Sequence, residues 1–259
     1  MDAGRKRAML RSSQRPAPRA ALPMTHRSTL RAPVAAFAIG LALALPCGSA
    51  LAQARSHAAD DAPAPAAAMN AAALGKSLAV GDLVFIRIGA YPFRKVADAT
   101  GTWTNHVGIV LDVSGPEPVI GESRFPFSGT TTLARFVARS AGGRVAVMRL
   151  PAPLTAAQQQ AVVAAAARRA HVFYDTGFDL HSRRQFCSRY AHEVLQEGAG
   201  IDVGRVENFQ TLLAQAPDAD VGFWRAWYFG SIPWQRETIT PASMLRSPGL
   251  TMVFDGTAD

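Results

Sequence analysis

The chain has 259 residues, 49% of them hydrophobic, and a formal net charge of +8 from 27 basic and 19 acidic residues. Eight of the basic residues and one acidic residue, Asp2, lie within the first 52 positions, which leaves 19 basic and 18 acidic residues in the remainder. The remainder is nearly neutral, so its charge gives no support to a nucleic-acid partner, and its composition is that of an ordinary globular protein.

The first 52 residues have the organisation of a secretory signal peptide. A basic start precedes an apolar run over residues 32–45, and Ala50-Leu51-Ala52 supplies the small residues of a cleavage site. Met24 is an alternative start that would give a signal of more ordinary length. The apolar run is shorter than the roughly 20 residues of a membrane span, so we expect a periplasmic or secreted protein with no stable membrane span in its mature form.

Two segments follow the predicted signal peptide. Residues 53–77 begin with a stretch rich in Ala, Pro and Asp that lacks an apolar period, and we predict a disordered linker there. Residues 78–256 have the length of one domain with a single core.

In this domain, strands are predicted first and helices later. Apolar runs bounded by turn residues predict strands over residues 82–88, 107–113, 118–123 and 144–150. Helices are predicted over residues 155–170, where Thr155 and Gln158 form a capping box, and over residues 187–197, ending at Gly198. A short helix opens at Thr240-Pro241, and residues 250–254 are predicted as an edge strand. This order predicts an α+β fold with a mainly antiparallel sheet packed against helices.

Cys187 is the only cysteine outside the predicted signal peptide, which contains Cys47. A lone thiol in a secreted protein is either reactive or a small buried hydrophobic residue, and the count alone does not separate the two. Cys187 begins a predicted helix, where partial positive charge and free N–H groups stabilise a thiolate and an oxyanion.

His106 and Glu122 lie on neighbouring predicted strands. Strand alternation puts Gly108 on the same face as His106, and we expect it to leave open space for a substrate over the imidazole. If the two strands pair, Glu122 reaches the imidazole and fixes its tautomer, as the third member of a nucleophile–base–orienter set does. The alternatives are a solvated histidine on an edge strand and a solvent-facing glutamate.

A metal site is the competing hypothesis for the same region. His171, His181, Cys187 and His192 lie within 22 residues, but neither a Cys-x-x-Cys nor a His-Glu-x-x-His spacing is present. We therefore expect no metal and no cofactor.

Several segments, in order, resemble the circularly permuted papain-like hydrolases of the YiiX type, which are relatives of the NlpC-type cell-wall peptidases. They are Gly81-Asp82-Leu83-Val84-Phe85, Asn105-His106-Val107-Gly108-Ile109, Glu122, Phe173-Tyr174-Asp175 and Gln185-Phe186-Cys187-Ser188. The resemblance implies a permuted papain-like fold with the nucleophile at a helix N-terminus. It makes Cys187 the nucleophile, His106 the base and Glu122 the orienting acid, and gives Tyr174 and Asp175 a supporting role in substrate binding.

The sequence departs from the family's pattern at two places near the expected cleft. Arg189 stands where the family often has an acidic residue, and His171-Val172-Phe173 stands where it tends to have Gly-Lys-Pro. Both departures concern the substrate rather than the three expected catalytic residues.

The resemblance implies a thiol hydrolase that cleaves an amide through a cysteinyl thioester. Its partner would be a peptide or acyl substrate, and the expected compartment makes a peptidoglycan stem peptide the natural candidate. One alternative is a lipid esterase or acyltransferase of the lecithin–retinol type, in which the aromatic run over residues 223–229 would line an acyl pocket. Another is a catalytically inactive binding module.

Overall fold

The computed structural model describes residues 67–217 and 219–259, which belong to one compact unit. The predicted signal peptide over residues 1–52 and the linker over residues 53–66 lie outside the described residues. None of the helices in the described part is long and apolar enough to cross a membrane.

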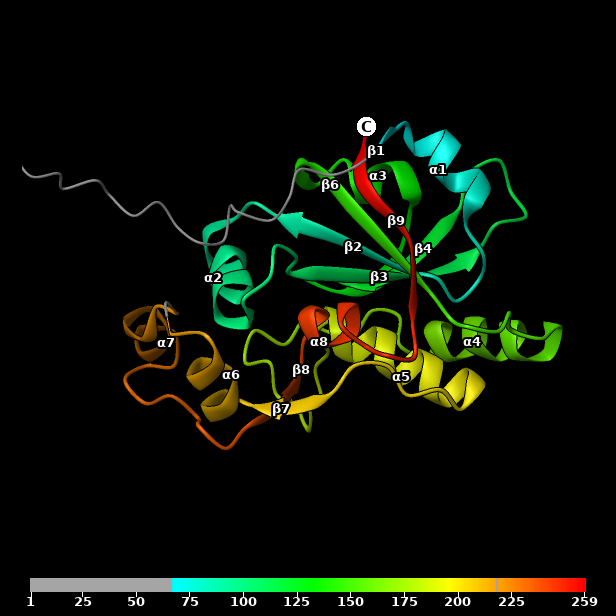
Figure 1. Cartoon of the computed structure of the whole chain (residues 1–259). Helices are drawn as coiled ribbons and strands as arrows, with labels where there is room; N and C mark the ends of the chain where they lie inside the picture. Colours follow the sequence, from blue (N-terminus) through cyan, green and yellow to red (C-terminus); the bar gives the residue numbers. More distant parts are fainter. Residues whose placement is uncertain (1–66, 218) are drawn as a thin grey trace, which may run out of the picture. The chain divides into compact units, whose positions relative to one another are not determined.

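One large sheet organises the domain, with the strand order β1-β9-β6-β2-β3-β4-β5 (Figure 1). Its strands are β1 (Ala67–Met69), β2 (Leu83–Ile88), β3 (His106–Asp112), β4 (Val119–Ser123), β5 (Ser128–Thr132), β6 (Ser140–Arg149) and β9 (Thr251–Ala258). Neighbouring strands are antiparallel except for the parallel pair of β1 and β9. The four strands predicted before residue 151 correspond to β2, β3, β4 and β6, and the α+β class with a mainly antiparallel sheet is confirmed.

Helices cover both faces of this sheet (Figure 1). Strand alternation sends Val107 and Ile109 into a core shared with α5 (Cys187–Ala199) and α4 (Ala156–Arg168). It sends Val110 to the opposite face, into a core shared with α1 (Ala71–Ser77) and α3 (Leu133–Val137).

A third group of elements lies at one end of the sheet, where α6 and α7 appear beside α2 in Figure 1. Its helices are α2 (Tyr91–Thr100), α6 (Phe209–Gln215) and α7 (Val221–Trp227). The strands β7 (Val206–Asn208) and β8 (Glu237–Ile239) form a separate two-stranded sheet. β8 and the short helix α8 (Pro241–Leu245) contact α5, and Ile239 and Met244 belong to the core shared with α5. An apolar cluster that includes Ala99, Phe209 and Trp224 holds α2, α6 and α7 together.

The close approach of α4 and α5 depends on a glycine inside α5. A Cβ built on Gly198 would lie 2.5 Å from Cα and 2.6 Å from the backbone N of Val162. The prediction that α5 ends at Gly198 is wrong, because α5 continues to Ala199 and Gly200 ends it in the left-handed conformation, at φ 71°. The capping box of Thr155 and Gln158 on α4 is confirmed.

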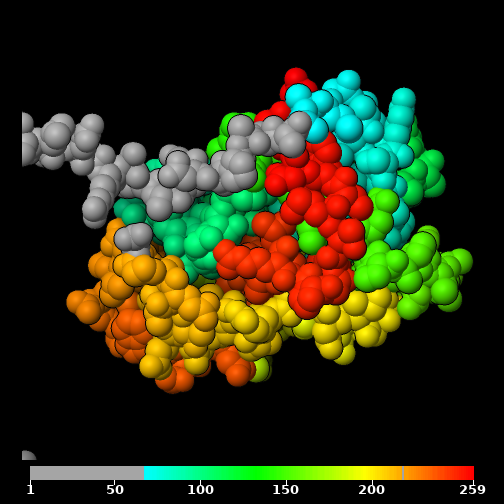
Figure 2. All heavy atoms as spheres, in the orientation of Figure 1, coloured from blue at the N-terminus to red at the C-terminus, as the bar shows by residue number. Residues whose placement is uncertain are grey.

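Two further predictions are wrong at the ends of the domain. Residues 67–77 form β1 and α1 instead of linker, because Asn70 accepts a hydrogen bond from the Ala73 N–H at 2.7 Å and Leu74 anchors the helix in the core. The predicted edge strand at residues 250–254 is β9, and it lies between β6 and β1. Figure 2 shows these C-terminal residues in red beside the cyan residues that begin the described structure.

Candidate active site

Cys187 is the first residue of α5, and its side chain is buried. The preceding residue, Phe186, offers no side-chain cap, so the first N–H groups of the helix remain available. The backbone N–H groups of Ser188 and Val107 hydrogen-bond to the Cys187 sulfur. The thiol therefore lies between the N-terminus of α5 and the start of β3.

His106 is the first residue of β3 and is buried beside this thiol. Its Nε2 atom lies 2.6 Å from Oε2 of Glu122, and the imidazole hydrogen-bonds to Cys187. Because Glu122 occupies Nε2, the nitrogen left for the thiol is Nδ1. The structure thus brings Cys187, His106 and Glu122 together in one buried line, and the pairing of His106 with Ile86 of β2 rules out a solvated edge position.

Gly108 does not leave open space over the imidazole, and this expectation was wrong. A Cβ at Gly108 would lie 2.5 Å from Cγ2 of Ile120 and 2.8 Å from Cε2 of Phe136. The Phe136 ring stacks on the His106 ring with a centroid distance of 5.6 Å. Gly108 makes room for this supporting aromatic ring because its face of the sheet is covered by α3.

Glu122 is fully buried and carries its charge among cationic partners. Nη2 of Arg139 donates to both carboxylate oxygens at 2.8 Å, and Nε of Arg124 lies 3.3 Å from Oε1. Burial would raise the pKa of Glu122, but the interactions with His106 and Arg139 outweigh it and hold the pKa below its usual value.

Sequence reasoning missed both arginines. The available signal was the buried carboxylate itself, since a charge in the core requires a partner of opposite sign.

The thiol and the imidazole stabilise each other as an ion pair. Burial would raise the pKa of Cys187, but the His106 charge, their hydrogen bond and the two backbone N–H groups lower it. Burial would likewise lower the pKa of His106, but Cys187 and Glu122 raise it to about 9. These shifts favour a thiolate beside an imidazolium, which is the reactive form of such a pair.

Tyr174 lies against the same sulfur. Its side chain is buried, and its hydroxyl makes no hydrogen bond to any other group of the described residues. It lies near enough to Cys187 for the sulfur to affect its pKa. Burial and then the Cys187 charge raise the pKa of Tyr174 well above 10, so the hydroxyl remains a proton donor.

The neighbouring Asp175 performs a different task. Its carboxylate accepts hydrogen bonds from the N–H groups of Gly177 at 2.8 Å and Asp179 at 3.0 Å. These bonds shape the turn after Tyr174. Tyr174 therefore lies at the thiol, whereas the carboxylate of Asp175 stabilises the loop through its hydrogen bonds.

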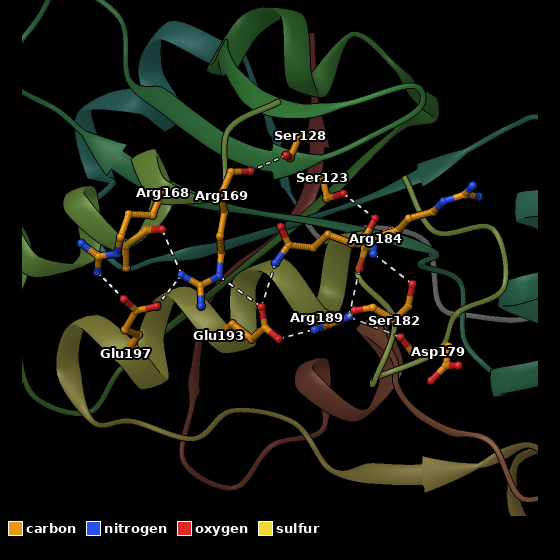
Figure 3. Close-up of polar contacts among 12 residues, drawn as sticks. Ser123, Ser128, Arg168, Arg169, Asp179, Ser182, Arg184, Arg189, Glu193 and Glu197 are labelled. Carbon is orange, nitrogen blue, oxygen red and sulfur yellow. Dashed lines mark hydrogen bonds and ion pairs between the residues drawn. The ribbon is translucent and has the colours of Figure 1, made fainter. Parts of the chain in front are cut away.

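Arg189 holds the loop that precedes Cys187 (Figure 3). Its Nη1 donates to the backbone oxygens of Ser182 at 2.6 Å and Arg184 at 2.9 Å, and its Nε donates to Glu193 at 2.7 Å. The guanidinium thus fastens this loop to α5.

The second departure from the family's pattern is His171 in place of a glycine, and His171 adopts a φ of 62°. This left-handed conformation is one that glycine adopts without strain.

No group of three or more His, Cys, Asp or Glu side chains in the described residues is arranged to hold a metal ion. His181 instead pairs with Glu237 at 2.7 Å, and Nδ1 of His192 lies 3.0 Å from the backbone oxygen of Val203. The histidines near Cys187 in sequence therefore do not converge on it.

The sequence and the structure both match one known family. Residues 77–254 match the family model described as "Permuted papain-like amidase enzyme, YaeF/YiiX, C92 family". A similar solved structure is that of the metalloprotein YiiX from Escherichia coli O157:H7, at 23% sequence identity and a TM-score of 0.61, covering 69% of this chain and 97% of that one. No curated protein shows significant similarity to the sequence. The chain belongs to the permuted papain-like amidase family of the YaeF/YiiX type.

Proposed function

We propose that this protein is a thiol hydrolase that cleaves an amide bond through a cysteinyl thioester, with Cys187 as nucleophile, His106 as base and Glu122 as orienting acid. The observation that carries the proposal is the buried line from the thiol through the imidazole to the carboxylate. The family's description as an amidase supports the reaction class.

In the first half of the reaction, the Cys187 thiolate attacks the amide carbonyl carbon and a C–S bond forms. The developing oxyanion would be held by the Ser188 N–H and the Tyr174 hydroxyl, which both lie at the sulfur. The His106 imidazolium gives its proton to the leaving nitrogen, the C–N bond breaks, and an amine departs.

In the second half, a water molecule attacks the thioester carbonyl while His106 takes its proton. The C–S bond breaks, the carboxylic acid leaves, and the thiolate–imidazolium pair is restored. Glu122 holds the imidazole in one tautomer and stabilises its charge throughout, and Arg139 and Arg124 keep Glu122 ionised.

The expected signal peptide leads us to propose a periplasmic or secreted location. Two classes of amide available there are peptidoglycan stem peptides and N-acylated amines or lipids. The second class, which corresponds to the lipid alternative, is favoured by one specific observation. Cys187 lines an apolar cavity, to which Trp224 of the aromatic run also contributes.

Alkylation of Cys187 tests the activated thiolate without requiring a known substrate. We expect iodoacetamide to modify wild-type Cys187 rapidly near neutral pH, and the His106→Ala variant to react at least tenfold more slowly because the thiol regains a higher pKa. Peptide mass mapping identifies the modified residue. Wild-type labelling that is no faster than that of the His106→Ala variant would overturn the proposed pair.

Incubation with muropeptides and with N-acyl amides, followed by mass spectrometry, tests the reaction itself. We expect the wild type to release an amine and a carboxylic acid. The Cys187→Ala variant should release neither product from either substrate class. Equal turnover by the wild type and the Cys187→Ala variant would exclude the thioester route.

A further inference from the structure

A second cavity, which we call the aromatic cage, opens on the far side of Tyr174 from the cavity that Cys187 lines. It encloses about 590 Å³ of space not filled by protein atoms, a figure that includes its open mouth. Nine residues line it, and none of them is Leu, Ile, Val or Met. Seven of the nine are aromatic, namely Phe93, Phe125, Tyr174, Phe178, Phe223, Trp224 and Trp227. A cavity for an ordinary apolar group has no need of such a restricted lining.

Neighbouring rings of the aromatic cage meet at steep angles. The interplanar angle is 68° between Phe93 and Tyr174 and 88° between Tyr174 and Phe178. It is 78° between Phe178 and Trp224. Rings turned in this way enclose an occupant from several sides. Because the face of an aromatic ring carries partial negative charge and attracts a cation within about 6 Å of its centre, such an enclosure suits an organic cation.

A buried carboxylate adds negative charge next to the aromatic cage. Asp175 is 6% exposed and stands between Tyr174 and Thr176, which both line the cage. Its hydrogen bonds come from backbone N–H groups, and Arg236 of the same region pairs with Asp179 instead, at 3.8 Å. After burial and the charge of the thiol, the Asp175 charge also raises the pKa of Tyr174, so it acts on the cage wall. A buried charge requires one of opposite sign, and a cation in the cage would supply it.

The lining also separates two kinds of organic cation. A primary ammonium has three N–H donors, whereas the side chains of the aromatic cage offer it only the hydroxyls of Tyr174 and Thr176. It would therefore lose hydration without full replacement. A quaternary ammonium has no N–H donor, and its methyl groups pack directly against ring faces.

We propose that the aromatic cage binds a quaternary ammonium group, such as the trimethylammonium of a choline-type ligand. Tyr174 both lines the cage and lies at the thiol, so a ligand held in the cage lies beside the reacting atoms. This binding activity goes beyond the amide hydrolysis proposed above and does not depend on it.

Two ligands of the same shape test the proposal on the wild-type protein. Choline carries the cation, and 3,3-dimethyl-1-butanol has a neutral carbon in place of the nitrogen. Isothermal titration calorimetry should show choline binding about tenfold more tightly, because the cation–π attraction adds to a fit that both ligands share. A merely apolar cavity would prefer the alcohol, which is less hydrated. Equal or tighter binding of the alcohol, or no binding of choline at millimolar concentration, would overturn the aromatic cage and leave the thiol amidase standing.

Variants of the cage provide an independent readout. Trp227→Leu removes a ring but keeps an apolar wall, so it should weaken choline binding by about fivefold and change binding of the alcohol by less than about twofold. Trp234→Leu, at a 42% exposed tryptophan outside the cage, is the matched control and should change neither. A folded Trp227→Leu protein, as judged by circular dichroism, that binds choline as tightly as the wild type would contradict the proposal.

A charge variant decides the matter if Trp227→Leu does not fold. Asp175→Asn removes the negative charge but keeps one oxygen that accepts a hydrogen bond. It should weaken choline binding by at least about threefold and leave binding of the alcohol unchanged. Equal losses for both ligands, or no loss for choline, would show that the carboxylate does not favour a cation in the cage.

Discussion

The charge on Glu122 is expected to set the alkaline limit of activity. In the native structure the pKa of His106 is about 9, against 6.5 for an unperturbed histidine. At about 1.4 kcal/mol per pKa unit, its surroundings stabilise the imidazolium by roughly 3 kcal/mol. Cys187 and Glu122 supply this stabilisation against the effect of burial. Glu122→Gln removes one of these charges but keeps the shape of the side chain.

The raised pKa keeps the His106 imidazolium protonated up to about pH 9. Removing the Glu122 charge should therefore make the imidazolium lose its proton at a lower pH. The descending limb of kcat/KM against pH should therefore shift from about 9 toward 6.5. At pH 8 the imidazolium fraction, and with it kcat/KM, would fall by up to about thirtyfold. The readouts are kcat/KM for an amide substrate and the iodoacetamide rate, each measured as a function of pH.

Glu237→Gln is the matched control, because Glu237 also pairs with a histidine, His181, at 2.7 Å but in an exposed position. Solvent screens such a pair, so neither limb should move. If Glu122→Gln leaves the alkaline limb at the wild-type pH, Glu122 does not stabilise the imidazolium and the orienting role is refuted.

Three further substitutions test separate contacts. Tyr174→Phe should lower kcat by roughly 10²–10³-fold with little change in KM if the hydroxyl holds the oxyanion, and an unaltered kcat would remove it from the mechanism. Gly198→Ala should lower the free energy of unfolding by about 1–3 kcal/mol in urea titrations, since the new Cβ meets the backbone of Val162, and a more stable protein would show that α4 can move away. Thr155→Ala removes the capping box of α4 and should cost about 1 kcal/mol in the same titration, and no measurable loss would mean that solvent replaces the cap.

Local pattern was enough to predict β2, β3, β4 and β6 of the central sheet and the helix that Cys187 begins. The capping box at Thr155 is a local hydrogen-bond pattern, so it is also readable from sequence. The convergence of His106, Glu122 and Cys187 was expected from the resemblance. The pairing of β3 with β4 brings His106 and Glu122 together, and the packing of α5 on β3 adds Cys187.

The remaining features depend on contacts between residues far apart in the chain. Arg139 reaches Glu122 from beyond α3, and no local signal connects the two residues. Gly108 was misread because its neighbour Phe136 is 28 positions away in the sequence. An Ala-rich segment likewise gives little sign that Leu74 will anchor it to the core.

The short strand β1 has a consequence for anyone who trims this chain. Ala67–Met69 pairs with β9, and the Ala71 N–H donates to the backbone oxygen of Asp259 at 2.8 Å. A chain cut at residue 78, where the sequence alone would begin the domain, would leave Gly256, Thr257 and Ala258 of β9 without their hydrogen-bonded partner on one side. Bare strands of this kind recruit strands from other molecules. The three residues of β1, which the sequence alone assigns to a linker, therefore cover a part of β9 that could otherwise pair with a strand of another molecule.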